Sequence, residues 1–146
     1  MPYVVCLIIV VADQLSKAAA RRWLATGPVS VIPGVFQLNL TQNPGAAFGL
    51  LVNRTGLFIA ITVAVLVAIV GFGRQIAAGD RRTEWGLALV AAGAVGNLID
   101  RVWRGTVTDF LDFYIWPIFN LADMAIVGGA IIIATTIIWR REGAQP

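Results

Sequence analysis

The feature that most constrains this chain is a set of apolar segments that acidic residues interrupt or bound. Four segments stand out, at about residues 2–23, 55–73, 84–103 and 120–140. In three of them the uncharged part is shorter than the roughly 20 residues that a helix needs to cross a bilayer. We therefore expect four transmembrane helices, with Asp13, Asp100 and Asp123 at or inside the membrane boundary rather than in free loops.

Composition supports a membrane protein of one domain. Of the 146 residues, 58% are hydrophobic and only 13% are charged, which a soluble chain of this size could not accommodate. The net charge of +3 does not indicate a nucleic-acid partner, because the basic residues form short clusters at the ends of apolar runs. Such clusters suit contact with lipid headgroups. We expect residues 1–146 to form a single all-α membrane domain.

The chemistry available to this chain is narrow. It has no histidine and one cysteine, Cys6, which excludes Ser-His-Asp and Cys-His catalysis and argues against a zinc site. A Ser-Lys dyad is also disfavoured, because Ser16 and Lys17 are adjacent on a helix and point about 100° apart. An aspartate pair remains, and it needs no metal or organic cofactor.

Alternation of the helices across the bilayer predicts where the polar residues meet. The end of the first helix, the end of the third and the start of the fourth lie on the same side, together with two long loops at about 25–54 and 102–119. Phe36–Thr41 alternates apolar and polar residues, and Gly105–Phe110 is rich in β-branched residues. We expect these stretches to form a small β-sheet on the membrane surface. The polar residues expected on this side are Asp13, Lys17, Asn97, Asp100, Arg101, Asn120 and Asp123.

An aspartate pair activates water when two carboxyl groups share one proton. Asp123 opens the fourth helix, and Asp109 lies in the loop before it, so this pair is the favoured one. Asp112 and Asp100 are alternatives, but Asp112 is interpreted as a solvated loop acid and Asp100 as an ion-pair partner of Arg101. The competing structural interpretation is an interfacial ion-pair network that ties helix ends together.

The N-terminal segment is expected to remain in the protein. Met1–Ala12 is apolar, but it lacks the basic leader of a signal peptide, and the residues that follow are a poor cleavage site. A count of the basic residues on the two sides favours cytoplasmic termini only if Lys17 and Arg101 belong to the site.

Five blocks of the sequence form a pattern when they are taken in order. The blocks are Asp13-Gln14-Leu15-Ser16-Lys17, Asn43-Pro44-Gly45-Ala46-Ala47-Phe48, Gly96-Asn97-Leu98-Ile99-Asp100-Arg101, Val107-Thr108-Asp109-Phe110 and Phe119-Asn120-Leu121-Ala122-Asp123. Together they resemble the lipoprotein signal peptidase (signal peptidase II) family over nearly the whole chain. One departure from the usual family pattern is the absence of a basic residue before Asp13.

The resemblance implies an aspartic endopeptidase of the bacterial cytoplasmic (inner) membrane. Such enzymes cut diacylglyceryl-modified prolipoproteins on the N-terminal side of the lipidated cysteine, and globomycin inhibits them. The matching positions make Asp109 and Asp123 the catalytic pair. The resemblance further implies four transmembrane helices, a small extracytoplasmic sheet with a surface helix, cytoplasmic termini and a site near the outer face. Residues expected to bind substrate or support the pair are Asp13, Lys17, Asn43, Asn97, Asp100, Arg101 and Asn120.

Two other classes of function stay open from the residues alone. A small proton-coupled carrier would also use membrane Asp, Asn and Lys, but carriers place charges near the midplane and show repeated halves. A structural scaffold would tolerate the loss of both carboxylates. The partners implied by the resemblance are diacylglyceryl-modified prolipoproteins and membrane lipid; we expect no nucleic-acid partner, and we expect a monomer.

Overall fold

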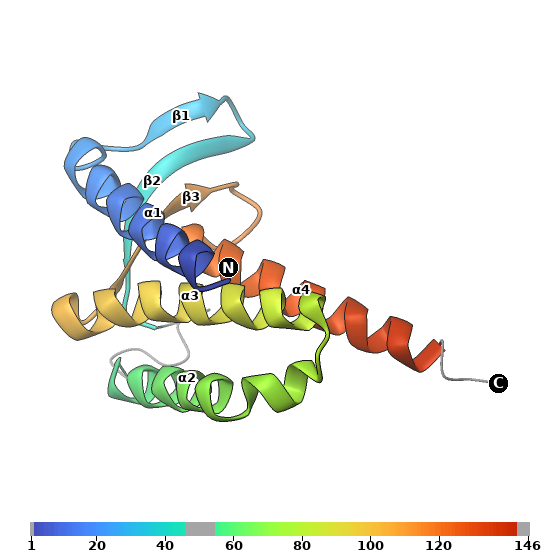
Figure 1. The fold of residues 1–146 in the computed structure, drawn as a ribbon. Helices are drawn as coiled ribbons and strands as arrows, with labels where there is room; N and C mark the ends of the chain where they lie inside the picture. The colour runs from blue at the N-terminus through green and yellow to red at the C-terminus, as the bar shows by residue number, and fades with distance from the viewer. Residues whose placement is uncertain (1, 46–54, 143–146) are drawn as a thin grey trace.

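The computed structural model describes residues 2–45 and 55–142, and within them the chain forms four helices and three strands (Figure 1). The surface helix implied by the resemblance does not occur in the described parts of the two long loops, and Ala46–Phe48 of the second block lie outside the described residues. The elements are α1 (Pro2–Trp23), β1 (Val29–Ile32), β2 (Phe36–Asn43), α2 (Thr55–Ala77), α3 (Arg81–Arg104), β3 (Val107–Asp112) and α4 (Leu121–Glu142).

Helix α3 is the centre of the bundle and contacts each of the other three helices (Figure 1). Its ends follow local rules. Asp80 precedes the helix and its carboxylate accepts a hydrogen bond from the Thr83 backbone N–H at 2.7 Å. Gly105 ends it in the left-handed conformation, and its N–H donates to the carbonyl of Arg101. This cap starts the helix earlier than the expected residue 84.

Close packing of α3 on α4 depends on glycine. A Cβ atom added to Gly93 would collide with the carbonyl oxygen of Ala122, and one on Gly129 would lie 2.9 Å from the backbone nitrogen of Val90. Nothing lies within 4 Å of the same atom on neighbouring Gly128. Small residues at the contact face thus let the two backbones approach, as in other membrane helix pairs.

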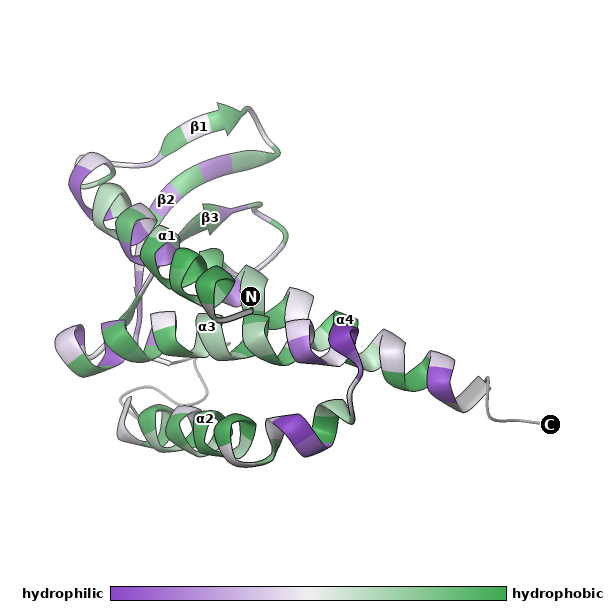
Figure 2. Cartoon of the chain, viewed as in Figure 1, coloured by the Kyte–Doolittle hydropathy of each residue, from purple (hydrophilic) through white to green (hydrophobic). Residues whose placement is uncertain are grey.

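Within the described residues, three helices are long and apolar enough to cross a membrane: Thr55–Ala77, Arg81–Arg104 and the Leu121–Arg140 part of α4. Helix α2 is apolar along most of its length (Figure 2), and among the described helices and strands it packs mainly on α3. Helix α1 has the necessary length, but it carries the charged residues Asp13, Lys17, Arg21 and Arg22 and is not one of these three. The expected multi-pass membrane architecture is therefore confirmed for three helices.

The expected small sheet is present. Its order is β1-β2-β3, with both pairs antiparallel, and Thr41 of β2 lies opposite Asp109 of β3. Sequence analysis predicted the regions of β2 and β3 but missed β1. A core of Ala20, Leu24 and Phe110 joins the end of α1 to the sheet. This packing fixes β3, and with it Asp109, over the ends of α1 and α3.

Candidate active site

The largest fully buried side chains among the described residues are mostly polar. Lys17, Asn120, Thr108, Asp13, Asp100 and Asp109 are each no more than 2% exposed. Burial of so many polar groups is costly unless they bind one another, so their hydrogen bonds define the site. They come from α1, α3, β3 and the start of α4, the elements that the alternation argument placed on one side.

Asp123 is held by the helix that it opens. Its Oδ2 accepts from the Asn120 backbone N–H at 3.2 Å, while Asn120 Oδ1 accepts from the Asp123 N–H at 3.0 Å. This reciprocal pair is a capping box in which Asn and Asp replace the usual Ser/Thr and Glu. The remaining oxygen, Oδ1, accepts from Asn97 Nδ2 at 2.8 Å. Helix geometry and α3 together fix the carboxylate.

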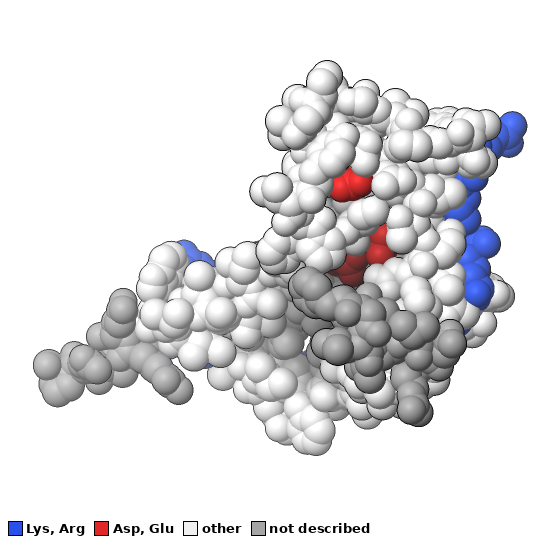
Figure 3. All heavy atoms as spheres, turned by 180° about the vertical axis from the view of Figure 1, so that it is seen from behind, with Lys and Arg blue, Asp and Glu red and all other residues white. Residues whose placement is uncertain are grey.

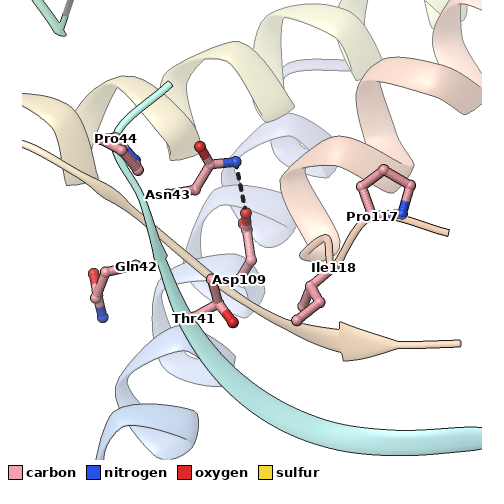
Figure 4. Close-up of a pocket in the computed structure, with 7 residues that line it drawn as sticks. All are labelled: Thr41, Gln42, Asn43, Pro44, Asp109, Pro117 and Ile118. Carbon is pink, nitrogen blue, oxygen red and sulfur yellow. Dashed lines mark hydrogen bonds between the residues drawn. The ribbon is translucent and has the colours of Figure 1, made fainter. Parts of the chain in front are cut away.

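Asn120 connects the two carboxyl groups of the predicted pair. Its Nδ2 donates to Asp109 Oδ1 at 2.6 Å, while its Oδ1 binds the backbone of Asp123. The other oxygen of Asp109 accepts from Asn43 Nδ2 at 3.0 Å, as Figure 4 shows. Asn43 is the last residue of β2. Asp109 and Asp123 are thus joined through one asparagine, and two further amides orient them.

Lys17 sets the orientation of Asn97. The ammonium group donates to Asn97 Oδ1 at 2.9 Å and lies 2.8 Å from Asp13 Oδ2. Because the oxygen of the Asn97 amide faces Lys17, its nitrogen faces Asp123. The Lys17 charge therefore reaches the pair through Asn97, without direct contact.

Asp13 links α1 to the start of α4. Its Oδ1 accepts from the Ala122 N–H at 3.0 Å, where a negative charge is favoured by the helix dipole. A Cβ on Gly96 would lie 2.6 Å from Asp13 Oδ2, so only glycine leaves room for this carboxylate. Gln14, to which sequence analysis gave no role, donates to Asp13 and to the Gly96 carbonyl.

The prediction that Asp100 forms an ion pair with Arg101 is wrong. Adjacent helical residues point about 100° apart, and Asp100 instead lies within 4 Å of Lys17, Arg21 and Arg104. Its Oδ2 accepts from the Thr108 N–H at 2.9 Å, which ties α3 to β3. Arg101 lies over the Phe58 ring of α2, at 5.3 Å from its centroid.

Asp112 is a buried strand residue rather than a solvated loop acid. It is 7% exposed and accepts from Gln37 Nε2 at 2.7 Å, from Asn39 Nδ2 and from the Tyr114 N–H. These bonds, the strongest from Gln37, hold the pKa of Asp112 below its usual range. The carboxylate is thus committed to hydrogen bonds within the sheet and the turn that follows it.

Two cavities flank the pair. The first, of about 190 Å³, is lined by the end of β2, Asp109 and the segment before α4 (Figure 4). The second, of about 270 Å³, lies among α2, α3 and α4, and Asn97, Arg101 and Asp123 line its polar end. Figure 3 shows acidic atoms in a hollow on one face, while basic side chains gather along one edge. Each carboxyl group therefore opens to its own cavity. The apolar lining of the second cavity is Ile61, Val65, Val90, Ala94 and Ile126.

The environment of Asp109 favours its protonated form. Burial raises its pKa from 3.8 to about 6, and the nearby Asp123 charge adds to this effect, against hydrogen bonds from Asn43 and Asn120. Like charges close together cannot both ionise easily. The arrangement therefore suits two carboxyl groups that share one proton. Among the described residues, no group of three or more His, Cys, Asp or Glu side chains is placed to hold a metal ion.

We predict a stability effect from this raised pKa. Between pH about 4 and about 6 the folded state binds the Asp109 proton more tightly than the unfolded state does, so this group's contribution to stability is lost as pH rises. The loss amounts to at most about 3 kcal/mol. Asp109→Asn cannot titrate, so its unfolding temperature should rise relative to wild type between pH 4 and 7. A difference in melting temperature that is constant with pH would contradict this assignment.

Comparison with known proteins is consistent with this geometry. The family described as Signal peptidase (SPase) II matches residues 5–139. The lipoprotein signal peptidase of Moorella thermoacetica is 45% identical over 150 aligned positions, covering 100% of both chains. That of Pelotomaculum thermopropionicum is 42% identical and covers 93% of this chain and 90% of the relative.

Two solved structures share the fold. Both are of a bacterial membrane enzyme determined by the in meso method, one at 2.3 Å and one at 1.9 Å resolution. The first has a TM-score of 0.89 and 31% identity, and covers 99% of this chain and 91% of that chain. The second has a TM-score of 0.85 and 33% identity, with 93% and 91% covered.

Proposed function

This chain belongs to the signal peptidase (SPase) II family, and we propose that Asp109 and Asp123 are the pair with which it cuts its substrates. It is an endopeptidase that removes the signal peptide from prolipoproteins. The observation that carries the proposed pair is their position. The two carboxyl groups are joined through Asn120, and each opens to a different cavity. A peptide that occupies both cavities passes the pair.

The proposed reaction needs only these residues and water. Asp109, whose pKa is raised by burial, holds the shared proton, and Asp123 acts as the base. Asp123 takes a proton from the water that attacks the scissile carbonyl carbon, while Asp109 donates its proton to the carbonyl oxygen. Asp123 then gives its proton to the leaving nitrogen and Asp109 takes back a hydroxyl proton, so the C–N bond breaks and the pair regains its starting state. Asn43, Asn97 and Asn120 hold the two carboxyl groups in place throughout. No metal or organic cofactor takes part.

The cavities support a particular direction for the substrate. The one beside Asp123 is mostly apolar and lies within the helices, which suits the apolar end of a signal peptide. The one beside Asp109 is bounded by the β2 backbone, which suits an extended peptide. We expect the substrate to carry a diacylglyceryl-modified cysteine, to approach from the bilayer, and to be cut on the N-terminal side of that cysteine.

Helix α1 is proposed as the fourth membrane span. Its two internal charges, Asp13 and Lys17, are fully buried and paired, so lipid does not meet them. Its other face is apolar and exposed, at a spacing that forms one stripe. The residues of this stripe are Val4, Leu7, Ile8, Val11 and Leu15.

The proposed topology places both termini in the cytoplasm and the site near the outer face of the bacterial inner membrane. When Lys17, buried in the site, and Arg101, over Phe58, are left out of the count, five basic residues of the sequence remain toward the termini and four toward the site. Residues 1–146 then form one domain that acts as a monomer, and globomycin is the expected inhibitor of this family.

Cleavage by the purified protein in lipid nanodiscs tests the function. A prolipoprotein with its diacylglyceryl group should shift to the mature size on a gel, and the same protein without that group should be cut at least about tenfold more slowly, because acyl chains contribute binding energy. Globomycin should stop the reaction. Failure to cut any lipidated substrate would refute the function, whereas equal cleavage of both forms would refute only the lipid requirement.

A further inference from the structure

The sheet carries a continuous apolar edge that no part of the described chain covers. On the β1–β2 hairpin, Val31, Ile32 and Val35 are about half exposed. On the loop that follows β3, Tyr114 is 52%, Ile115 93% and Trp116 68% exposed. We name these six residues the apolar rim.

The two parts of the rim are held together. Phe36 of the hairpin stacks on Phe113 of the loop, with ring centroids 4.6 Å apart. The Tyr114 hydroxyl donates to Gln37 Oε1, and Gln37 in turn donates to Asp112. Hairpin and loop therefore behave as one surface rather than as two independent tips.

Charge is absent from the whole rim. The sequence has no Lys, Arg, Asp or Glu from residue 23 to residue 53, or from residue 113 to residue 122. An exposed edge strand that faces water normally carries charges that prevent pairing with another chain, but β1 has none. An uncharged apolar edge of this kind is the composition expected of a surface in lipid.

The two tips that carry the rim point in a direction that suits an apolar, uncharged surface. In Figure 1 the turn between β1 and β2 and the loop after β3 both point to the right, the direction in which α4 runs from Leu121. The tips thus turn back along the membrane-spanning helices instead of away from them. The apolar surfaces of those helices and of the rim then lie at neighbouring depths.

We propose that the apolar rim inserts into one lipid leaflet of the bilayer. This is the leaflet at the end of the bundle where the buried polar residues of the candidate active site lie. Its partner is the acyl and headgroup boundary of the bilayer, where Trp and Tyr are favoured. Insertion holds the sheet, and therefore Asp109 of β3, beside lipid. A lipid-modified substrate can then reach the pair without its acyl chains crossing water. This inference extends the proposed function but does not depend on which residues catalyse.

Spin labels at single cysteines test the insertion. In a Cys6→Ala background, Val35→Cys and Ile115→Cys would be labelled and placed in nanodiscs, with Val67→Cys on exposed lipid-facing α2 and Arg22→Cys as references. Oxygen concentrates in lipid and a charged nickel chelate in water. Rim labels should match the Val67 reference, with high oxygen and low nickel accessibility. Rim labels whose accessibility to oxygen and nickel matches the Arg22 reference would overturn the proposal. Rim labels that neither reagent reaches would also overturn it, because they would be covered by protein.

A second measurement needs no label. Brominated lipids quench tryptophans that lie in the bilayer, so a variant that keeps Trp116 as its one tryptophan, with Phe at the other four positions, should lose fluorescence in them. Unquenched Trp116 fluorescence in that folded variant would overturn insertion. Cleavage is assayed separately on the same samples, so loss of activity and loss of insertion are distinguished.

Discussion

Asp109→Asn and Asp123→Asn are each expected to reduce kcat/KM for a lipidated prolipoprotein by about 10³-fold or more. Asparagine keeps the size of the side chain, but it can neither take a proton from water nor donate a carboxylic proton. Each variant therefore removes one half of the shared-proton pair while it leaves the bundle packed. Single-turnover cleavage in nanodiscs measures the loss.

A matched control comes from the opposite end of the bundle. Asp80 caps α3 through Thr83, and asparagine is an equally good cap, so Asp80→Asn should cleave at the wild-type rate. Thermal melts would establish that all three variants are folded. If either pair variant keeps more than about a tenth of wild-type activity while folded, the assignment of the pair is wrong.

Lys17→Met is expected to destabilise the protein by about 3–5 kcal/mol. The ammonium group is fully buried and is the partner of Asp13 at 2.8 Å, with Asp100 at 3.8 Å. Its loss leaves buried carboxylates without their cation and frees the amide of Asn97 to turn. Unfolding by titration with SDS in mixed micelles measures the free energy.

A double variant separates the effect of the lost charge from the effect of the altered packing. Lys17→Met combined with Asp13→Asn removes both members of the closest ion pair, while the asparagine oxygen can still accept from the Ala122 N–H. We expect the double variant to recover at least half of the lost stability. Arg22→Met, at an exposed position, should change stability by less than about 0.5 kcal/mol. A loss below about 1 kcal/mol for Lys17→Met, or no recovery in the double variant, would contradict this account.

Much of the architecture follows from patterns that the sequence displays. Uncharged segments that are too short to cross a bilayer placed Asp13, Asp100 and Asp123 at one boundary, and the structure gathers them there. Alternating residues in Phe36–Thr41 predicted a strand, and β2 spans that stretch. Strand β1 was missed because Val29–Ile32 is short and lies among Pro and Gly residues that read as turns.

Partners within the polar cluster could not be read in the same way. Spacing along a helix gives faces, but the hydrogen bonds of Asp100 depend on how α1 and β3 pack on α3. Sequence analysis therefore paired Asp100 with the wrong arginine, and it gave no role to Gln14, Thr108 or Arg21. The one local signal in the site was the Asn120-x-x-Asp123 spacing, which fits a capping box.

The capping box also has a consequence for the order in which the protein is made. Asp123 takes its position only when the first turn of α4 forms, and Asp13 and Asn97 hold that turn from helices synthesised earlier. Because α4 follows the rest of the described bundle in the chain, the proposed pair is complete only after α4 has been made. If Asp109 and Asp123 are the catalytic pair, we expect proteolytic activity to appear only then, and a truncated chain that lacks α4 should be inert rather than a misdirected protease.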